Sequence, residues 1–222
     1  MLTLREIHAK QTLHSGKWSH YFNIYETHFN KFRNKKPVVV EVGIHKGGSA
    51  GMWKEYFGPG ATIVGIDIDP DIKNYQTEGC VQILGNQGDP VFWDDFLKEY
   101  PEIDVFIDDG SHHCQHQILT LQKVWPAIKL GGVYLCEDTH TNYWAEYGGG
   151  LKNPSTFLNY TKIITDVMNS AYYRNLDKHP DNTMFANFFK DLVGMHYYDS
   201  VVVLDKDQKE TPYNVMSTPY EP

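Results

Sequence analysis

Short apolar runs and longer segments of helical periodicity alternate along residues 37–136. The apolar runs are rich in β-branched residues and are followed by glycine or aspartate, which is typical of buried strands. They predict strands at 37–43, 62–68, 81–84, 105–107 and 133–136. Between them, apolar residues recur every three or four positions and predict helices at about 49–56, 92–100 and 115–129. This alternation favours a parallel sheet with helices on both faces.

The C-terminal pattern differs, because two apolar runs follow each other with no helix between them. After a helix predicted at 157–171, the runs 193–198 and 201–204 are separated only by Asp199 and Ser200. Parallel neighbours need a long crossover, so such a short connection requires an antiparallel hairpin. We therefore expect an α/β fold with a Rossmann-like, seven-stranded sheet, in which five parallel strands precede the hairpin. Residues 1–36 predict a helical, amphipathic arm, residues 37–205 the ligand-binding domain, and residues 206–222 a tail.

The composition excludes several classes of protein. The chain has 222 residues, which suits one domain, and its net charge of −8 argues against a nucleic acid partner. No apolar run approaches the roughly 20 residues that cross a bilayer, and the first residues lack the apolar core of a signal peptide. Three cysteines without a C-x-x-C pair favour reduced thiols and a cytoplasmic location.

Glycines and polar residues follow the first three predicted strands, where a parallel sheet binds its ligands. The first turn reads E-V-G-I-H-K-G-G-S from Glu41 to Ser49, with Gly43 and Gly47 able to approach a ligand closely. Asp67 ends the second strand, where an acid can accept hydrogen bonds from ribose hydroxyls, and Asn86 and Gln87 follow the third. Ordinary turns also contain these residue types, but their succession favours a nucleoside-type ligand. The dinucleotide fingerprint G-x-G-x-x-G is absent, which disfavours NAD.

Three acids follow the fourth and fifth predicted strands. Asp109 comes directly after one strand, and Glu137 and Asp138 come directly after the other. Carboxylates that converge in one cleft repel each other unless a cation neutralises them. Oxygen ligands select a hard divalent ion, most plausibly Mg²⁺, with Mn²⁺ and Ca²⁺ also compatible. The alternative is that these acids belong to solvated turns.

Asp109 belongs to the stretch D-D-G-S-H-H-C-Q-H-Q, from Asp108 to Gln117, which also holds three histidines. His112 is placed to take the proton from a substrate hydroxyl as a general base. Zinc binding by His112, His113, Cys114 and His116 is disfavoured, because residues this close in sequence cannot all converge on one ion. Ser111 is a candidate cap for the following helix.

These motifs resemble class I S-adenosylmethionine-dependent methyltransferases: E-V-G-x-x-x-G-G-S, then G-I-D-I-D, D-x-F-I-D-D-G-S-H and G-G-V-Y-L-C-E-D. The D-D-G-S-H motif with the later E-D pair is similar to the metal-dependent sugar O-methyltransferases and to cephalosporin-biosynthesis methyltransferase-like proteins. The resemblance covers roughly residues 15–205. It implies transfer of a methyl group from S-adenosylmethionine to a sugar or glycoside hydroxyl.

The resemblance and the strand-end positions together give a set of expected sites. His112 is the expected base, and Asp109, Glu137 and Asp138 are the expected metal ligands. Asp108 is expected near the methionine end of the cofactor. The segment Thr139 to Gly150 combines aromatics with glycines and suggests a lid or a mobile loop, with Tyr143 and Trp144 over the acceptor. The expected cofactor contacts are Glu41, Gly43, Gly47, Ser49, Asp67, Asn86, Gln87 and Asp108.

Two other functions remain open from the sequence: an NAD-dependent oxidoreductase with a Rossmann-like fold, and a non-catalytic binding protein that kept the fold. The expected partner is a small-molecule glycoside or saccharide, with no nucleic acid and no membrane. The aromatic arm, including Trp18, His20 and Tyr21, is either a further acceptor contact or an ordinary packing helix, and it is a candidate contact for self-association into a homo-oligomer.

Overall fold

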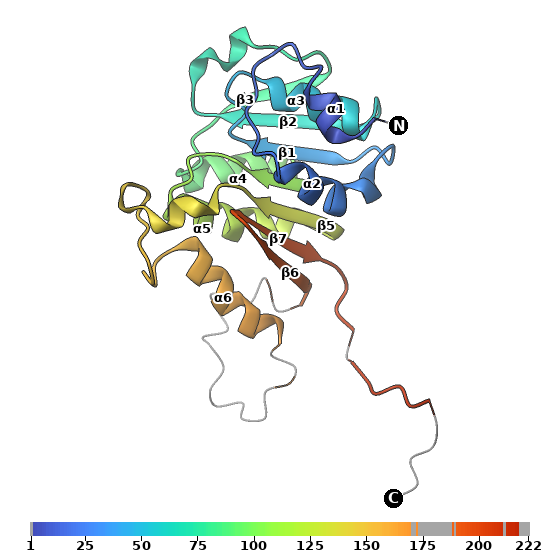
Figure 1. Ribbon diagram of the computed structural model, residues 1–222, viewed down its shortest axis with the longest axis vertical. Helices are drawn as coiled ribbons and strands as arrows, with labels where there is room; N and C mark the ends of the chain where they lie inside the picture. The colour runs from blue at the N-terminus through green and yellow to red at the C-terminus, as the bar shows by residue number, and fades with distance from the viewer. Residues whose placement is uncertain (1, 170–171, 173–187, 189, 211, 218–222) are drawn as a thin grey trace, which may run out of the picture.

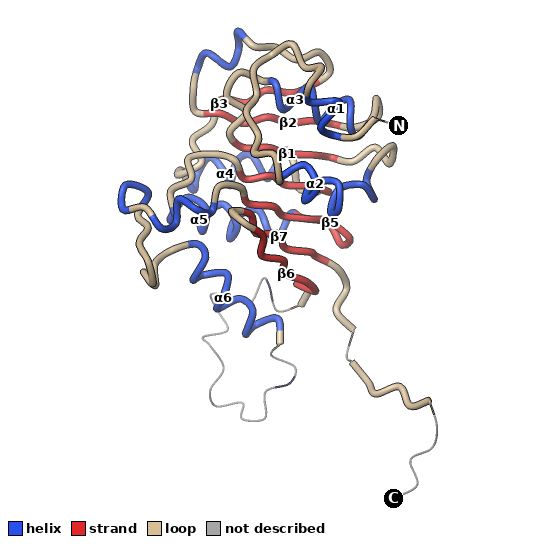
Figure 2. Tube along the Cα trace, viewed as in Figure 1, coloured by secondary structure: helices blue, strands red, loops and turns tan. Residues whose placement is uncertain are grey.

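A mixed, seven-stranded sheet forms the centre of the computed structural model, which describes residues 2–169, 172, 188, 190–210 and 212–217. The strand order is β3-β2-β1-β4-β5-β7-β6, and the strands follow this order from top to bottom in Figure 2. The first five strands are parallel, while β7 runs antiparallel to both β5 and β6. The expected fold class is therefore confirmed. The strands are β1 (Val38–Val42), β2 (Thr62–Asp67), β3 (Cys80–Leu84), β4 (Ile103–Asp108), β5 (Ile128–Cys136), β6 (Leu192–Tyr198) and β7 (Val201–Lys206).

Helices cover both faces of the sheet (Figure 1). One face carries α1 (Leu4–His8), α2 (Tyr21–Phe29) and α3 (Gly48–Phe57), and the other carries α4 (Pro90–Glu99), α5 (Cys114–Val124) and α6 (Phe157–Met168). Along β4, Phe106 faces one core while Val105 and Ile107 face the other, and all three are fully buried. This two-sided burial explains why the central strands read as continuous apolar runs.

The connection between α5 and β5 differs from the sequence prediction. The helix predicted at 115–129 ends at Val124, and a short 3₁₀ helix, Trp125–Ala127, follows it. Pro126 provides no backbone N–H and so cannot continue the α-helix. The strand predicted at 133–136 begins earlier, because residues 128–132 already belong to β5, where the register with β4 is irregular and Gly131 adopts φ of +81°. Glycine at this position lets the strand bulge without breaking the sheet.

The N-terminal arm is helical only at its two ends. Residues 9–20 lie between α1 and α2 without a helix and cross the sheet edge at which β1, β4 and β5 end. The backbone carbonyls of Leu13 and His14 pack directly against Gly48 at the start of α3, where a Cβ atom would lie 2.5 and 2.6 Å from them. The arm therefore borders the edge of the sheet at which the functional residues were expected.

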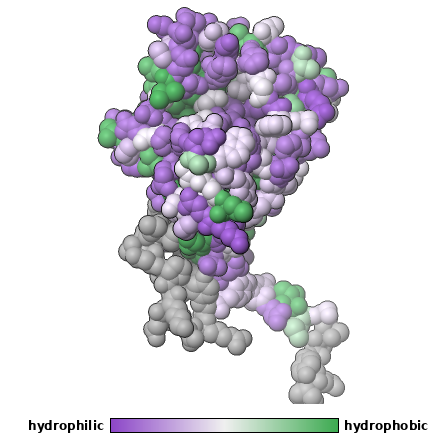
Figure 3. All heavy atoms as spheres, turned by 60° about the vertical axis from the view of Figure 1, so that its left-hand side comes forward, coloured by the Kyte–Doolittle hydropathy of each residue, from purple (hydrophilic) through white to green (hydrophobic). Residues whose placement is uncertain are grey.

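At the other end of the domain, α6 ends at Met168, and residues 170–171 of the helix predicted at 157–171 lie outside the described residues. The face seen in Figure 3 is mostly hydrophilic, with hydrophobic residues scattered over it. Within the described ranges, no helix combines the length and the apolar character that crossing a membrane requires.

Candidate functional site

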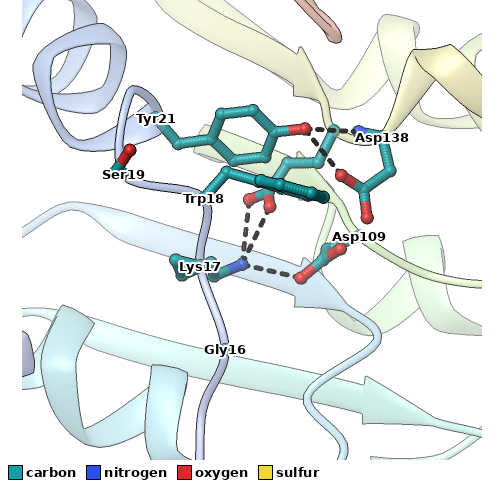
Figure 4. A pocket seen from close by; sticks show the side chains of 8 residues that line it. Gly16, Lys17, Trp18, Ser19, Tyr21, Asp109 and Asp138 are labelled. Carbon is teal, nitrogen blue, oxygen red and sulfur yellow. Dashed lines mark hydrogen bonds and ion pairs between the residues drawn. The ribbon is translucent and has the colours of Figure 1, made fainter.

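Lys17 lies at the centre of a cluster of buried carboxylates. Its Nζ atom is 3.1 Å from Glu41 Oε1, 2.7 Å from Asp109 Oδ2 and 2.9 Å from Glu137 Oε1. Only 2% of the lysine side chain is exposed to solvent. Figure 4 shows Lys17 reaching from the arm to Asp109, which follows a strand end. The cluster thus joins the arm to the edge of the sheet through charged side chains.

Backbone hydrogen bonds hold the acids in place beyond the ends of the strands. The N–H of Asp109 donates to the carbonyl of Val42 at 3.0 Å, and the N–H of Glu137 donates to the carbonyl of Asp108 at 2.8 Å. Glu41 lies on β1 and pairs in register with Ile107 of β4. The three strands end at one edge of the sheet, so acids that are distant in sequence become neighbours.

The cluster holds more negative than positive charge. Four carboxylates, those of Glu41, Asp109, Glu137 and Asp138, lie near one ammonium group. Burial raises the pKa of Asp109 to about 7, although Lys17 opposes this shift. Burial, together with the charge of Asp109, raises the pKa of Glu137 well above its usual range. Burial also disfavours the charged form of Lys17, but its acidic neighbours outweigh this and hold the pKa of the ammonium high. An additional cation would therefore be favoured here.

The remaining acid, Asp138, lies on the open side of the cluster. Its backbone adopts φ of +52°, and its Oδ1 accepts a hydrogen bond of 2.6 Å from the hydroxyl of Tyr21 at the start of α2. Asp109, Glu137 and Asp138 line a pocket of about 500 Å³ together with Lys17 and Tyr21 of the arm. The structure therefore brings the three acids expected as metal ligands to one cavity, although their role as ligands stays a prediction.

Two overlapping groups of side chains place candidate ligand atoms within 4.8 Å of one another. The first contains Glu41, Asp109 and Glu137, and the ammonium of Lys17 already lies among them. The second contains Asp109, His112 and Asp138. Oxygen ligands with uncompensated negative charge at an open pocket fit a hard divalent ion such as Mg²⁺.

His112 lies beside these acids and is available to accept a proton. Its Nε2 is 3.7 Å from Asp138 Oδ2, and its Nδ1 is buried with no hydrogen-bond partner among the described residues. Burial lowers the pKa of the imidazole, while Asp138 and Asp108 partly oppose that shift. The carbonyl of His112, where the backbone has φ of +58°, accepts a hydrogen bond of 3.1 Å from Thr141. A fixed, neutral imidazole of this kind can act as a general base.

Two further cavities lie at the ends of β1, β2 and β3. One, of about 160 Å³, is lined by Gly43, Asp67, Asn86 and Gln87 among other residues, and the other, of about 290 Å³, by Gly43, Ser49, Asp67 and His112 among others. Gly43 has φ of +94°, and a Cβ atom there would lie 1.8 Å from the carbonyl oxygen of Asp109. Only glycine therefore allows β1 and the turn after β4 to approach this closely.

The other expected cofactor residues have structural partners of their own. Gly47, the N-cap of α3, has φ of +76°, and a Cβ atom there would lie 2.7 Å from the carbonyl of Tyr75. Glu41 accepts hydrogen bonds from Ser49 Oγ at 2.6 Å and Trp53 Nε1 at 3.0 Å. Glu41 therefore points to the lysine cluster, and its contact with a cofactor remains a prediction.

Asp108 is buried in a network of neutral donors. Its carboxylate accepts hydrogen bonds from Gln87 Nε2 at 2.6 Å and from the hydroxyl of Tyr134 at 3.0 Å. Burial raises its pKa to about 6 in spite of these donors. Gln87 also accepts a hydrogen bond of 2.8 Å from the N–H of Ser111. The network fixes the turn that carries Asp109 and His112.

The histidines after His112 have local partners. Ser111 Oγ lies 2.8 Å from His116 Nδ1, and α5 begins with His113 as its N-cap, without a side-chain cap. The expectation that Ser111 is the cap of this helix was therefore wrong, because His113 occupies the N-cap position and the Ser111 hydroxyl accepts only a hydrogen bond of 3.4 Å from the N–H of His113 in addition to its contact with His116. Among the described residues, the groups able to bind a metal include neither Cys114 nor His116.

An aromatic pocket of about 300 Å³ adjoins the acidic pocket. Trp144 lines it together with Trp18, His20 and His140, whereas Tyr143 is 54% exposed and is not among the lining residues. Asn142 anchors the loop, because it donates to Gln117 at 2.9 Å and accepts from the N–H of Leu158 at 3.0 Å. The function of this loop as a lid stays a prediction.

Sequence reasoning missed Lys17 and the bond between Tyr21 and Asp138. The available signal was the arm segment G-K-W-S-H-Y, which formed part of the resemblance but contains no recognisable ligand pattern. The contacts of Lys17 with Asp109 and Glu137 span 92 and 120 residues, so no local spacing reveals them.

Comparison with known proteins shows that the chain is similar to O-methyltransferases that act on sugars of natural products. It is 30% identical over 202 residues to the demethylmacrocin O-methyltransferase of Streptomyces fradiae and 32% identical over 201 residues to the L-olivosyl-oleandolide 3-O-methyltransferase of Streptomyces antibioticus. These alignments cover 86% and 84% of this chain and 50% of each relative, so the chain spans about half the length of the curated relatives it matches. No family model matches the sequence.

A similar structure is that of the methyltransferase MycE from the mycinamycin biosynthetic pathway, in complex with Mg and SAH. It matches with a TM-score of 0.82 and 28% sequence identity, over 93% of this chain and 55% of MycE. A further structure of MycE, in complex with Mg, SAH and mycinamycin VI, matches with a TM-score of 0.82 and 27% identity, over 99% of this chain and 57% of MycE. These relatives give no support to the oxidoreductase or to the non-catalytic binding protein.

Proposed function

We propose that this chain, which belongs to the class I S-adenosylmethionine-dependent methyltransferases, catalyses metal-dependent O-methylation of a sugar or glycoside. The observation that carries the proposal is the arrangement of Asp109, Glu137 and Asp138 around one pocket, with the imidazole of His112 beside it. This arrangement suits the removal of a proton from a hydroxyl group. The same relatives that support the family are O-methyltransferases that act on glycosides.

S-Adenosylmethionine would supply the methyl group, carried as an electrophile on its sulfonium. Asp67 and the turn after β1 would hold its nucleoside, with Asn86 and Gln87 near the base, because these residues line the cavities at the ends of β1 to β3. Gly43 would leave room for the cofactor to lie close to the backbone. The turn with Asp109 would lie toward the methionine end, because Asp109 and His112 line the same cavity as Asp67.

Mg²⁺ would lower the pKa of the acceptor hydroxyl and orient it. Asp109, Glu137 and Asp138 would hold the ion, and Mn²⁺ or Ca²⁺ would also suit these oxygen ligands. Lys17, which also lines this pocket, would stay paired with Glu41 and Glu137.

His112 would remove the acceptor proton at Nε2, the nitrogen that lies 3.7 Å from Asp138 Oδ2. The buried environment keeps the imidazole neutral and ready to accept this proton. Asp138 would then stabilise the protonated ring. Trp18 and Trp144 would contact the apolar face of the sugar, since both line the adjoining aromatic pocket.

Three further features belong to the proposal. The acceptor is a small-molecule glycoside or saccharide, because relatives act on glycosides such as those named above. The location is the cytoplasm, because Cys80, Cys114 and Cys136 are free thiols. The arm, in which the side chain of Trp18 is exposed, would provide a contact for a homo-oligomer.

The test is release of S-adenosylhomocysteine by the purified chain with S-adenosylmethionine, Mg²⁺ and a panel of deoxysugar glycosides that carry vicinal hydroxyls. Turnover is expected with at least one glycoside and should vanish in Asp109→Asn. Cofactor binding, measured by calorimetry, should persist in that variant. Turnover that survives complete removal of divalent ions would contradict the metal-dependent part, and failure to bind S-adenosylmethionine would contradict the whole proposal.

A further inference from the structure

A second cluster of metal-binding side chains lies outside the acidic pocket, where α2 meets the C-terminal hairpin. His28 comes from the last turn of α2, His196 from β6 and Asp205 from β7. We call this group the hairpin cluster. On the hairpin, Gly194 pairs with Asp205 and His196 pairs with Val203, so His196 and Asp205 are diagonal neighbours on the sheet face that α2 covers.

The candidate ligand atoms are already close to one another. His196 Nε2 lies 2.7 Å from Asp205 Oδ2, and His28 Nδ1 lies 4.0 Å from Asp205 Oδ1. The three ligand atoms all lie within 4.8 Å of one another, and the two imidazole rings have centroids 4.7 Å apart. Ligands about 2.1 Å from a tetrahedral ion lie about 3.4 Å from each other, so small rotations of these side chains would suffice.

The buried histidine is oriented for binding by a neighbouring side chain. Nε2 of His28 lies 2.9 Å from the hydroxyl of Tyr198, which leaves Nδ1 facing Asp205. Metal-bound histidines commonly use their second nitrogen in this way, which fixes the ring.

The surroundings leave room and access for an ion. Gly194 lies next to the cluster, where a Cβ atom would lie 3.2 Å from Asp205 Oδ2 and 3.6 Å from His196 Nε2. The side chain of His196 is 42% exposed and that of Asp205 24% exposed, whereas that of His28 is 6% exposed. One side of the cluster is therefore anchored in the protein and the other is open to water.

We propose that the hairpin cluster is a Zn²⁺ site with His28, His196 and Asp205 as its protein ligands and water in the open position. Two imidazoles and one carboxylate suit zinc, whereas Mg²⁺ prefers oxygen ligands alone. The ion would fasten α2 to the hairpin. The same helix begins at Tyr21, which bonds Asp138, so the site would also stabilise the arm at the acidic pocket. This inference does not depend on the methyltransferase activity.

The experiment is a titration of the metal-stripped, purified chain with Zn²⁺ in excess Mg²⁺, followed by calorimetry, with Co²⁺ absorption as a second readout. One Zn²⁺ per chain is expected to bind. His196→Ala and Asp205→Asn should each weaken binding by at least about 10- to 100-fold, and Tyr198→Phe by about tenfold. Zn²⁺ should raise the melting temperature of the parent chain but not that of His196→Ala, whose exposed side chain can be removed without opening the core.

Two matched variants make the proposal falsifiable. His116→Ala removes a histidine that lies outside the hairpin cluster, and Asp109→Asn disrupts the acidic pocket. Both variants should keep the zinc site intact. Loss of Zn²⁺ binding in either of them, with binding kept in His196→Ala, would overturn the assignment. Equal binding by the parent chain and His196→Ala, or no binding by either, would also overturn it and leave the hairpin cluster as a hydrogen-bonded network.

Discussion

Replacement of Lys17 by methionine tests whether this residue balances the charge of the acidic cluster. Lys17→Met keeps an unbranched side chain that is one atom shorter and removes the charge. The side chain of Lys17 is 2% exposed, and its ammonium lies within 3.1 Å of three carboxylates, so the variant leaves buried anions without their partner. Removing one partner of a buried ion pair costs about 3–5 kcal/mol. For a chain of this size, 1 kcal/mol shifts the melting temperature by about 2–4 °C.

The expected result is therefore a melting temperature lower by about 6–20 °C, measured by circular dichroism in EDTA. In Mg²⁺ the difference between the two proteins should shrink, because a divalent ion supplies part of the missing positive charge. Lys98→Met is the matched control: Lys98 also forms an ion pair of 2.7 Å, with Asp95, but its side chain is 76% exposed. That variant should melt at the temperature of the parent chain.

A melting temperature of Lys17→Met within about 2 °C of the parent chain in EDTA would refute the reasoning. It would mean that the carboxylates take up protons, or admit water, without cost to the fold. An equal loss in Mg²⁺ and in EDTA would contradict the narrower idea that the pocket accepts a divalent ion.

Three further predictions concern catalysis and pH. His112→Ala should lower turnover by about 10²–10⁴-fold and leave the calorimetric dissociation constant of S-adenosylmethionine unchanged. The adjacent variant His113→Ala should keep its turnover. Equal losses of turnover in the two variants would exclude His112 as the base. Trp144→Ala should raise KM for the glycoside by about 2- to 12-fold with a smaller change in kcat. Tyr143 lies outside the aromatic pocket, so Tyr143→Ala should change neither constant. The reversed pattern would contradict the proposed acceptor site. Burial raises the pKa of Asp109 from 3.8 to about 7. The contribution of the protonated Asp109 carboxyl to the stability of the fold is therefore complete below the pKa of the unfolded chain, and it is lost as the pH rises through the pKa of the folded chain. In EDTA the parent chain should therefore gain more thermal stability than Asp109→Asn when the pH falls from about 8 to about 5, and parallel profiles of the two proteins would contradict the shift.

The order of strands and helices was readable from the sequence because each element carries its own periodicity. Apart from Glu41, the run from Val38 to Val42 is apolar on both faces, which marks a strand in the middle of a sheet. The two-residue connection at Asp199 and Ser200 forced an antiparallel hairpin. The extent of β5 was not readable, because a bulge with Gly131 resembles a turn when only neighbouring residues are compared.

The candidate site was predictable to the extent that its residues follow strand ends. Asp109 and Glu137 were expected to meet because parallel strands place their carboxyl ends along one edge, and they do lie in one pocket. The sequence named Glu41 as a cofactor contact, but it did not reveal that this carboxylate pairs with Lys17. A one-letter pattern gives the end of a strand but not the direction of each side chain.

By itself, the sequence determined the fold class and the edge of the sheet where polar chemistry gathers, since both follow from periodicity and strand ends. Only the tertiary structure decided what balances the charge there. Lys17 lies in a segment without regular structure, and it acquires meaning only when the arm packs across Gly48 and Asp109. Charge compensation depends on distance in space, and no local pattern records it.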